Sequence, residues 1–214
     1  MDKRGLHSDS YKALLFDFDG TLLDSFSAHF DVFQIMFARF GIRIEKQQFL
    51  DFYSPNWYKT YEGMGLPQKD WKAADKIWLQ EVEHQEPPLY PGVSETLREL
   101  NQICAIGLVT SGSKNRVLKD LERTGITSIF KVIVTGDDIQ RPKPSPDGLD
   151  LALQKLDIQT DETAYIGDAN ADYEMSMAAG VDFIGVRSAY DRFITDGLFT
   201  CMESVTELPE LLGI

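Results

Sequence analysis

The chain has 214 residues, of which 43% are hydrophobic and 26% are charged, which suits one globular domain or a core domain with a small insert. The formal net charge of -13 at pH 7 argues against a basic nucleic-acid-binding face, so we expect no nucleic-acid partner. Residues 1–10 are polar rather than a signal peptide, and no apolar run reaches transmembrane length, so we expect no membrane partner. Two cysteines make no disulfide framework, which predicts a reducing, cytoplasmic location.

The predicted chemistry begins at the sequence DFDGT, residues 17–21. The short apolar run before it, Ala13–Phe16, is typical of a strand buried on both faces of a parallel sheet. Asp17 comes where this strand leaves the core, and Asp19 points to the same side if the backbone stays extended. Two such carboxylates repel unless a cation lies between them, and Mg²⁺ takes one or two carboxylates with water and phosphate oxygens. The alternative is an Asp-rich turn whose side chains cap backbone amides.

Residues 26–86 have no pattern of a buried strand. Phenylalanines recur at helical spacing from Phe26 to Phe40, and a second helical pattern includes Trp71 and Trp78. We therefore expect a small helical domain at residues 25–88, inserted into a core formed by residues 1–24 and 89–214.

An irregular aromatic stretch, residues 53–59, is expected between the two helices of this insert. It includes Trp57, Tyr58 and Lys59. We weigh two interpretations equally: these side chains face the substrate, or they pack between helices.

From residue 89 onward, β and α patterns alternate, which predicts right-handed crossovers and a mostly parallel sheet flanked by helices. The predicted strands are residues 103–109, 131–134, 163–166 and 181–186. The predicted helices are residues 90–100, 114–124 and 173–179, together with one that follows an N-cap at Ser145 and has Pro146 at its first position.

Polar side chains follow the first two of these strands. Thr110, Ser111 and Gly112 stand between a strand and a helix, where hydroxyls, an accessible backbone and a helix N-terminus suit an anion. The alternative is that Ser111 or Ser113 only caps the helix, and for Ser113 we favour the cap. After the second strand, Lys143 lies between two prolines on a stiffened backbone, which suits an ammonium group held near a phosphate.

The strand at residues 163–166 is followed by two further carboxylates, Asp168 and Asp172. Asp172 also has a structural explanation, because a carboxylate near a helix N-terminus is favourable. Since the carboxyl ends of parallel strands face the same way, we expect these residues to converge with Asp17, Asp19 and Lys143 on one cleft.

Taken together, these strand ends resemble the four motifs of the haloacid dehalogenase (HAD) superfamily, and the insert resembles its helical C1-type cap. The resemblance covers nearly the whole chain and is greatest to the phosphoglycolate phosphatase-like and β-phosphoglucomutase-like branch. It implies an α/β fold, with a Rossmann-like parallel sheet and a small inserted all-helical cap. It also implies a Mg²⁺-dependent phosphatase that acts on a small phosphorylated metabolite through an aspartyl-phosphate. We expect a monomer or a homodimer.

Carried over to this chain, the resemblance makes Asp17 the nucleophile and Asp19 the general acid and base. Mg²⁺ would be held by Asp17, the backbone carbonyl of Asp19 and Asp168, with Asp172 supporting the metal shell. Lys143 would offset the negative charge of Asp17 and of the phosphoryl group.

The resemblance also assigns the remaining site residues. Thr110, Ser111 and Gly112 would bind phosphoryl oxygens, with the main hydroxyl left open between Thr110 and Ser111. Thr21 would orient the first loop. Arg187, just after the last predicted strand, is either another anion contact or a surface arginine.

Four other activities are weighed against the phosphatase. Carbon–halogen cleavage is disfavoured because the chain keeps both Asp19 and Asp168. A β-phosphoglucomutase-like phosphomutase is the main alternative, because His29 has the spacing of a hinge histidine in that enzyme, although it also reads as a partly exposed helix histidine. A phosphonatase would need a cap lysine, for which Lys59 is the candidate. A catalytically silent binding protein has no support, since the carboxylates and the lysine are in place.

Overall fold

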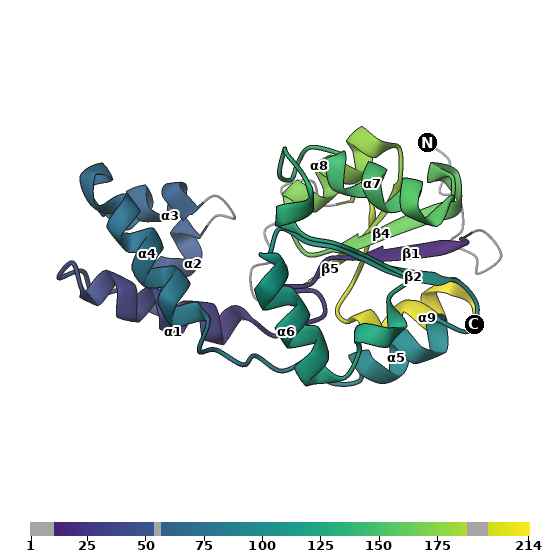
Figure 1. Cartoon of the computed structure of the whole chain (residues 1–214), viewed down its shortest axis with the longest axis horizontal. Helices are drawn as coiled ribbons and strands as arrows, with labels where there is room; N and C mark the ends of the chain where they lie inside the picture. Colours follow the sequence, from purple (N-terminus) through teal and green to yellow (C-terminus); the bar gives the residue numbers. More distant parts are fainter. Residues whose placement is uncertain (1–10, 54–56, 188–196) are drawn as a thin grey trace. The chain divides into compact units, whose positions relative to one another are not determined.

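The computed structural model describes residues 11–53, 57–187 and 197–214 (Figure 1). The chain divides into two compact units, one formed by Met1–Asp24 with Pro88–Ile214 and the other by Ser25–Pro87. We call them the sheet unit and the helical unit. Across the described residues, none of the helices combines the length and the apolar character that a membrane crossing requires.

The sheet unit is built on a parallel sheet whose strand order is β3-β2-β1-β4-β5-β6. Strand β1 lies between β2 and β4, and its last residue, Phe16, is level with Leu108 and Ile166. The described strands are β1 (Ala13–Phe16), β2 (Ala105–Val109), β3 (Val132–Val134), β4 (Thr163–Gly167), β5 (Asp182–Val186) and β6 (Thr200–Met202). Because the last residues of β1, β2 and β4 lie nearly side by side, the residues that follow these strands meet at one edge of the sheet.

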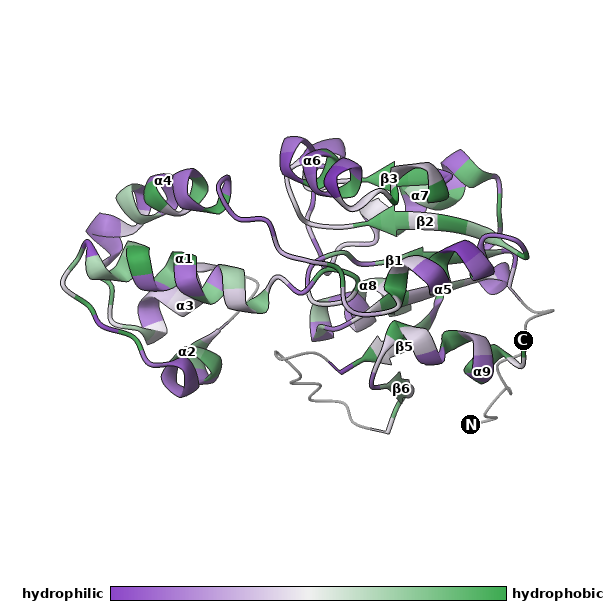
Figure 2. Cartoon of the chain, turned by 90° about the horizontal axis from the view of Figure 1, so that it is seen from below, coloured by the Kyte–Doolittle hydropathy of each residue, from purple (hydrophilic) through white to green (hydrophobic). Residues whose placement is uncertain are grey.

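Helices cover both faces of the sheet, with α7 and α8 on one face and α5, α6 and α9 on the other (Figure 1). Alternate residues of β1 serve the two faces, since Leu14 and Phe16 join the core under α5 and α6 while Leu15 joins the core under α7. The bounds of these helices are α5 (Val93–Leu100), α6 (Lys114–Thr124), α7 (Asp147–Leu156), α8 (Asn170–Ala179) and α9 (Leu208–Leu212). Figure 2 shows the resulting pattern, with β2 hydrophobic and the covering helix α6 largely hydrophilic.

The helical unit has an aromatic core. Its helices are α1 (Phe26–Ala38), α2 (Lys46–Phe52), α3 (Trp57–Gly63) and α4 (Trp71–Val82). The ring of Phe33, which is 1% exposed, lies 5.0 Å from Phe49, 6.0 Å from Trp78 and 6.4 Å from Tyr61 between centroids. The phenylalanine stripe predicted for the first helix is therefore packing surface, as an amphipathic helix requires.

The predicted α/β fold, a parallel sheet flanked by helices with a helical insert, is confirmed. Two details inside the insert were wrong. Residues 57–59 belong to helix α3 rather than to an irregular stretch, and helix α2 was not expected. Each of these helices has seven residues, too few for a hydrophobic period to emerge from sequence. Residues 54–56 of the stretch lie outside the described residues.

The predicted capping of two helices also differs from the structure. Helix α7 begins at Asp147 with Pro146 at the N-cap, and the Ser145 hydroxyl donates to the Asp147 carboxylate at 2.7 Å. Ser113 does stand at the N-cap of α6, but its side chain makes no capping hydrogen bond. The Lys114 backbone N–H instead donates to the carboxylate of Asp137 at 2.7 Å, so a residue 23 positions away does the capping.

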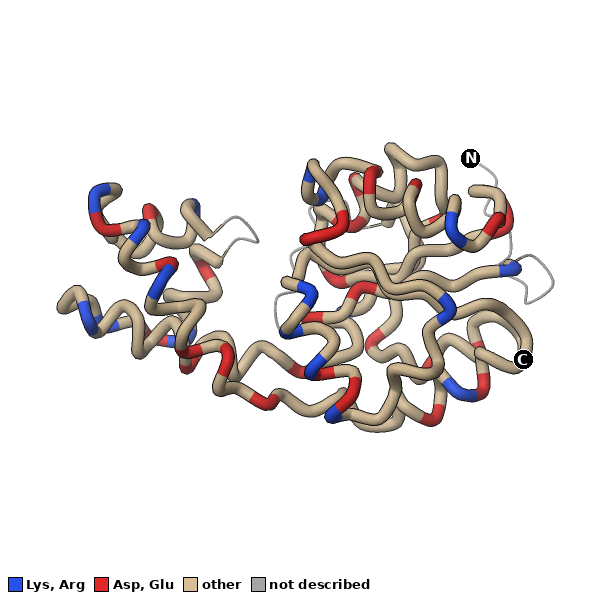
Figure 3. Tube along the Cα trace, viewed as in Figure 1, with Lys and Arg blue, Asp and Glu red and all other residues tan. Residues whose placement is uncertain are grey.

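Acidic and basic residues are interspersed along both units (Figure 3). With 34 acidic against 21 basic residues in the whole sequence, the surface has an acidic excess. A nucleic-acid interface needs a concentrated basic face, which this distribution does not favour.

Candidate active site

The carboxyl ends of β1 and β4 bring two aspartates to the same edge of the sheet. The backbone N–H of Asp17 donates to the carbonyl of Ile166 at 2.8 Å, so sheet pairing continues as far as the aspartate itself. Asp168 follows β4 directly. Both residues are buried, since Asp17 is 8% and Asp168 is 5% exposed. Contacts within the protein, rather than water, therefore fix the positions of the two carboxylates.

Asp17, Asp168 and Asp172 form a carboxylate cluster, in which one oxygen from each lies within 4.8 Å of the others. Gly20 makes room for the cluster, because it adopts φ +81° and a Cβ there would collide with the carboxylate of Asp168. The Thr21 hydroxyl donates to Asp168 at 3.2 Å, which fixes that side chain. Buried carboxylate oxygens at this spacing are the hard donor set that a divalent cation such as Mg²⁺ prefers. The residues present therefore fit the metal that the motifs imply.

Lys143 supplies the positive charge of the cluster. Its Nζ donates to Asp17 and to Asp172, each at 2.7 Å, and to the hydroxyl of Tyr165 at 2.8 Å. Tyr165 in turn donates to the carbonyl of Val109 at 2.8 Å, which ties the end of β2 to the same network. Each N–H of the ammonium group thus has a partner, and the lysine holds two carboxylates in fixed orientations.

The electrostatics of the cluster follow from its burial. Burial raises the pKa of Asp17 to about 7, with Lys143 opposing the rise and Asp172 adding to it. Burial alone would lower the pKa of Lys143, but Asp17 and Asp172 raise it above its ordinary value, so the ammonium form persists. A cation bound to the cluster would favour ionised Asp17, because it interacts only with the charged form.

Asp172 makes one contact at the start of α8 and another within the carboxylate cluster. One of its oxygens accepts from the backbone N–H of Ala169 at 3.1 Å at the start of α8, and the other contacts Lys143. Gly167 makes room for it, since a Cβ there would lie 2.6 Å from the Asp172 carboxylate. The two contacts therefore coexist in one side chain, and support of a metal shell by Asp172 stays a prediction.

The Asp19 carboxylate is bound by an arginine of α6. Arg116 of α6 donates from Nη1 to one oxygen of Asp19 at 3.1 Å, and from Nη2 to the other. The backbone carbonyl of Asp19 was predicted to bind the metal, and its carboxylate was predicted to transfer protons. Arg116 therefore contacts the group that has the predicted proton-transfer role.

The loop after β2 is ordered by its own hydrogen bonds. The Gly112 N–H donates to the Thr110 hydroxyl oxygen at 3.2 Å, and the Gly136 N–H donates to the Gly112 carbonyl at 3.0 Å. Thr110 is buried, whereas Ser111 is exposed at the rim. The two candidate hydroxyls thus differ in accessibility, and the choice between them stays a prediction.

Sequence analysis missed Arg116 and Tyr165. Tyr165 did give a signal, because a tyrosine inside an otherwise apolar buried strand needs a partner for its hydroxyl. Arg116 gave none, since an arginine in the first turns of a helix usually reads as a solvated residue.

The aromatic residues singled out in the insert pack within the helical unit. The Trp57 ring lies 3.8 Å from that of Trp78, and the His29 ring lies 5.7 Å from the same tryptophan. Tyr58 stacks on Trp71 at 4.9 Å and donates to Asp75 at 2.9 Å. These contacts favour the packing interpretation for Trp57 and Tyr58. His29 lies in α1 and is half-buried, which agrees with its interpretation as a partly exposed helix histidine.

Arg187 lies beside a cavity of about 310 Å³ that is also lined by Gly20, Thr21 and Tyr90. Its Nε is 3.5 Å from the carboxylate of Glu203, and its side chain is partly exposed. This arginine is therefore near the first loop but is paired with an acidic side chain.

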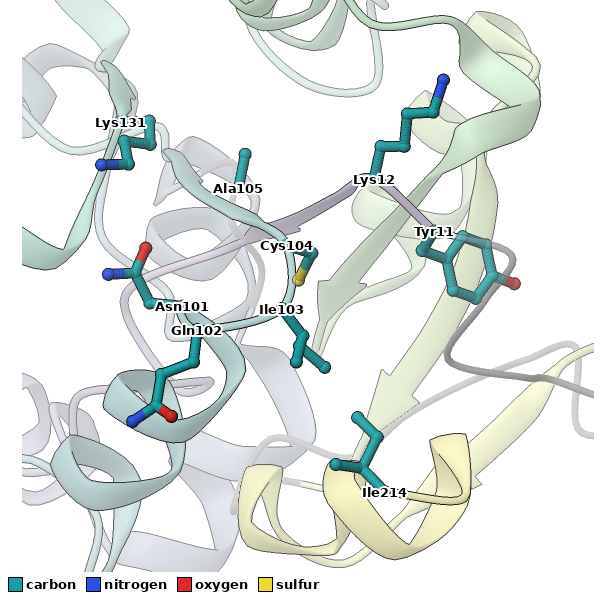
Figure 4. A pocket seen from close by; sticks show the side chains of 9 residues that line it. All are labelled: Tyr11, Lys12, Asn101, Gln102, Ile103, Cys104, Ala105, Lys131 and Ile214. Carbon is teal, nitrogen blue, oxygen red and sulfur yellow. The ribbon is translucent and has the colours of Figure 1, made fainter.

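A separate hollow of about 690 Å³ lies at the opposite edge of the sheet, next to the starts of β1 and β2 (Figure 4). Lys12, Cys104 and Lys131 are among the side chains that line it. Because Asp17 and Asp168 follow the other ends of the strands, this hollow is not part of the candidate active site.

Comparison with known proteins agrees with these motifs. Pyrophosphatase PpaX from Bacillus pumilus is 30% identical over 188 residues, which are 85% of this chain and 85% of that protein. Validoxylamine A 7'-phosphate phosphatase from Streptomyces hygroscopicus subsp. limoneus is 26% identical over 198 residues, covering 85% of this chain and 88% of that protein. A haloacid dehalogenase-like family hydrolase from Streptococcus pneumoniae has the same fold, with a TM-score of 0.81 at 19% identity, over 94% of this chain and 98% of that one.

The family pattern of haloacid dehalogenase-like hydrolases matches residues 14–186. The match includes both strand ends that carry the aspartates and the loop that carries Lys143. It also spans the helical insert. Because the match extends over most of the sequence, the chain belongs to the haloacid dehalogenase-like hydrolase family, as its motifs predicted.

Proposed function

We propose that this protein is a Mg²⁺-dependent phosphatase that hydrolyses a small phosphorylated metabolite through an aspartyl-phosphate on Asp17. The observation that carries the proposal is the buried cluster in which Lys143 bonds both Asp17 and Asp172 while Asp168 lies alongside. Three buried carboxylates and one ammonium group are costly to desolvate, and fixed charge of this kind is typical of a catalytic site.

Asp17 is the nucleophile in this proposal. A carboxylate is a weak nucleophile, but forming an acyl phosphate divides one difficult displacement into two easier ones. A carboxylate oxygen attacks phosphorus, the bond from phosphorus to the leaving oxygen breaks, and the phosphoryl group is then on Asp17. Lys143 fixes the orientation of the attacking carboxylate and offsets the negative charge that builds up on the phosphoryl oxygens.

Asp19 carries the protons of both half-reactions. As the acid, it donates a proton to the departing oxygen, so that the leaving group departs in its protonated form. As the base, it then takes a proton from the water molecule that attacks the phosphorus of the acyl phosphate. Cleavage of that intermediate releases inorganic phosphate and restores the Asp17 carboxylate.

The metal and the phosphoryl group have distinct binding residues. Asp17, Asp168 and the backbone carbonyl of Asp19 would hold Mg²⁺, with Asp172 supporting this shell. When bound, the ion supplies positive charge that lets a carboxylate and an anionic phosphoryl group approach each other. Thr110 and Ser111 would donate to the phosphoryl oxygens, alongside the N-terminal amides of α6.

The substrate class is proposed from this chemistry together with the relatives. One relative is named a pyrophosphatase and another a validoxylamine A 7'-phosphate phosphatase, so relatives of similar length differ in the substrate that their names give. We propose that this chain cleaves a phosphoric monoester or anhydride of a small molecule. The two cysteines, Cys104 and Cys201, form no disulfide, which supports a reducing, cytoplasmic setting.

The test is release of phosphate from p-nitrophenyl phosphate by the full chain, with and without Mg²⁺, compared with Asp17→Asn. We expect Mg²⁺-dependent turnover that falls by about 10³-fold or more in the variant. Intact-mass measurement of the acid-quenched wild type should detect a phosphorylated enzyme that Asp17→Asn lacks. Asp150→Asn, which changes an exposed aspartate on α7, is the matched control and should keep wild-type turnover.

Full turnover by Asp17→Asn would overturn the proposed nucleophile. A screen of phosphoglycolate, pyrophosphate, nucleoside monophosphates and hexose phosphates would then narrow the substrate. Slow hydrolysis combined with fast transfer to a sugar phosphate, in the presence of a bisphosphate activator, would identify a phosphomutase instead.

A further inference from the structure

Arg116 contacts both oxygens of the Asp19 carboxylate. Its two terminal nitrogens donate one to each oxygen, with the Nη1 contact at 3.1 Å. The Arg116 side chain is 15% exposed and that of Asp19 is 23% exposed, so the pair is shielded from much of the solvent screening that weakens surface ion pairs. A two-pronged contact of this kind fixes the plane of the carboxylate as well as its position.

A second residue of α6 contacts the guanidinium group of Arg116. Asp120, one helical turn further on and 2% exposed, has an oxygen 3.5 Å from Nη1 of Arg116. Asp120 is also bonded by Arg123 at 2.9 Å, which leaves it anchored on both sides. Arg116 therefore connects Asp19 in the first loop to Asp120, a buried residue of α6.

The loop after β2 provides the space that the guanidinium group needs. A Cβ at Gly112 would lie 2.5 Å from Nη2 of Arg116 and 2.8 Å from Cγ2 of Val117. A side chain at position 112 would therefore displace the Arg116 guanidinium group or Val117 from the position that each has here. Gly112 was predicted to bind phosphate. Its lack of a side chain also leaves space for Arg116 and Val117.

We propose that Arg116 is a positioning residue that holds the Asp19 carboxylate where it transfers protons to the leaving group and from water. The inference rests on the proposed function, because it gives Asp19 its role in that reaction. Without Arg116, the Asp19 carboxylate would lose the two donors that fix its plane and would be free to rotate.

The test compares two substrates of almost the same shape, phenyl phosphate and p-nitrophenyl phosphate, in the same enzyme preparation. Phenol, with a pKa of about 10 like the tyrosine side chain, departs poorly without a proton, whereas p-nitrophenolate is stabilised by its nitro group and departs as the anion. The value of kcat/KM reports events up to loss of the leaving group, which is the step that needs the acid. The ratio of the two values does not depend on the fraction of protein that is folded.

For Arg116→Gln we expect kcat/KM for phenyl phosphate to fall by about 10²-fold, because misplacing a catalytic group by about 1 Å has an effect of that size. The value for p-nitrophenyl phosphate should fall by less than about threefold, since its departure does not need the acid. Arg116→Lys keeps the positive charge but cannot donate to both oxygens in the same fixed geometry. Its ratio of the two kcat/KM values should therefore lie between those of the wild type and Arg116→Gln. Lys119→Gln is the matched control, because Lys119 is an exposed basic residue on the same helix, and its ratio should equal that of the wild type.

Equal losses on both substrates in Arg116→Gln, or a change of ratio in Lys119→Gln as large as in Arg116→Gln, would overturn this inference and leave Arg116 as a structural ion-pair partner. These outcomes differ from a failure of the proposed function. If the wild type released no phosphate from either ester in the presence of Mg²⁺, the proposed function would fail before the ratio was measured.

Discussion

The sheet unit and the helical unit bury different kinds of side chain. Among the described residues, the sheet unit buries the charged groups of Asp17, Asp120, Asp168 and Asp172. The buried polar side chains of the helical unit are hydroxyls, Ser25 and Thr60, within an aromatic core. One unit thus keeps charge in its interior, and the other, within the described residues, keeps it on the surface.

This difference separates the sources of stability in the two units. Burying a carboxylate is unfavourable unless a partner compensates it, so the stability of the sheet unit depends on Lys143 at the ends of its strands. The helical unit is stabilised by apolar contact area and ring packing. Substitutions that remove one kind of interaction should therefore destabilise one unit and spare the other.

The largest effect is expected from removing the ammonium group of the carboxylate cluster. Lys143→Met leaves Asp17 and Asp172 buried without their shared partner, and breaking a buried ion pair in this way destabilises by about 3–5 kcal/mol. Urea unfolding monitored by circular dichroism measures the free energy of unfolding, and turnover of p-nitrophenyl phosphate should be lost as well. Lys155→Met, an exposed lysine on α7, is the control. A change as small as that of the control would show that the cluster does not depend on Lys143.

The next effect concerns the aromatic core of the helical unit. Phe33→Ala removes a ring that packs against Phe49, Tyr61 and Trp78, and we expect destabilisation by about 3 kcal/mol. Hydrogen exchange resolved by residue should show faster exchange in α1 and α4, with unchanged protection of β1. Phe52→Ala, at a position that is already 45% exposed, should change little. Equal loss of protection in β1 would mean that the two units unfold together.

The smallest effect concerns pH and the metal. Because burial raises the pKa of Asp17 from 3.8 to about 7, the folded chain binds a proton more tightly than the unfolded chain between those values. Stability of the metal-free protein should therefore fall as pH rises from about 4 to about 7. A divalent cation binds the ionised form, so stabilisation by Mg²⁺ should be larger at pH 8 than at pH 5, by about 1–3 kcal/mol at saturating ion.

Thermal unfolding with and without MgCl₂ at the two pH values measures this difference. Asp168→Asn should remove most of the Mg²⁺ effect, whereas Asp150→Asn should not. Stabilisation of the same size at both pH values would contradict a role for Asp17 in binding the ion.

Much of the site was accessible from the sequence because of a general property of parallel sheets. The residues after β1, β2 and β4 meet at one edge whatever the details of packing, so the position of Asp17, Thr110 and Asp168 at the strand ends predicted their convergence. Lys143 was predicted from its residue type and its proline neighbours, and it does bond Asp17. The short helices α2 and α3 were missed because seven residues carry too little periodicity.

The sequence by itself determined which strand ends carry the charged groups, since a buried apolar run followed by a carboxylate is a local pattern. Only the tertiary structure decided how those groups pair: Tyr165 with Lys143, and Arg116 with Asp19 across 97 positions. Such pairs depend on the rotation of a helix about its axis and on the space that a glycine leaves in a loop. Neither is visible in a linear pattern, because the contact exists only once the helix has packed on the sheet.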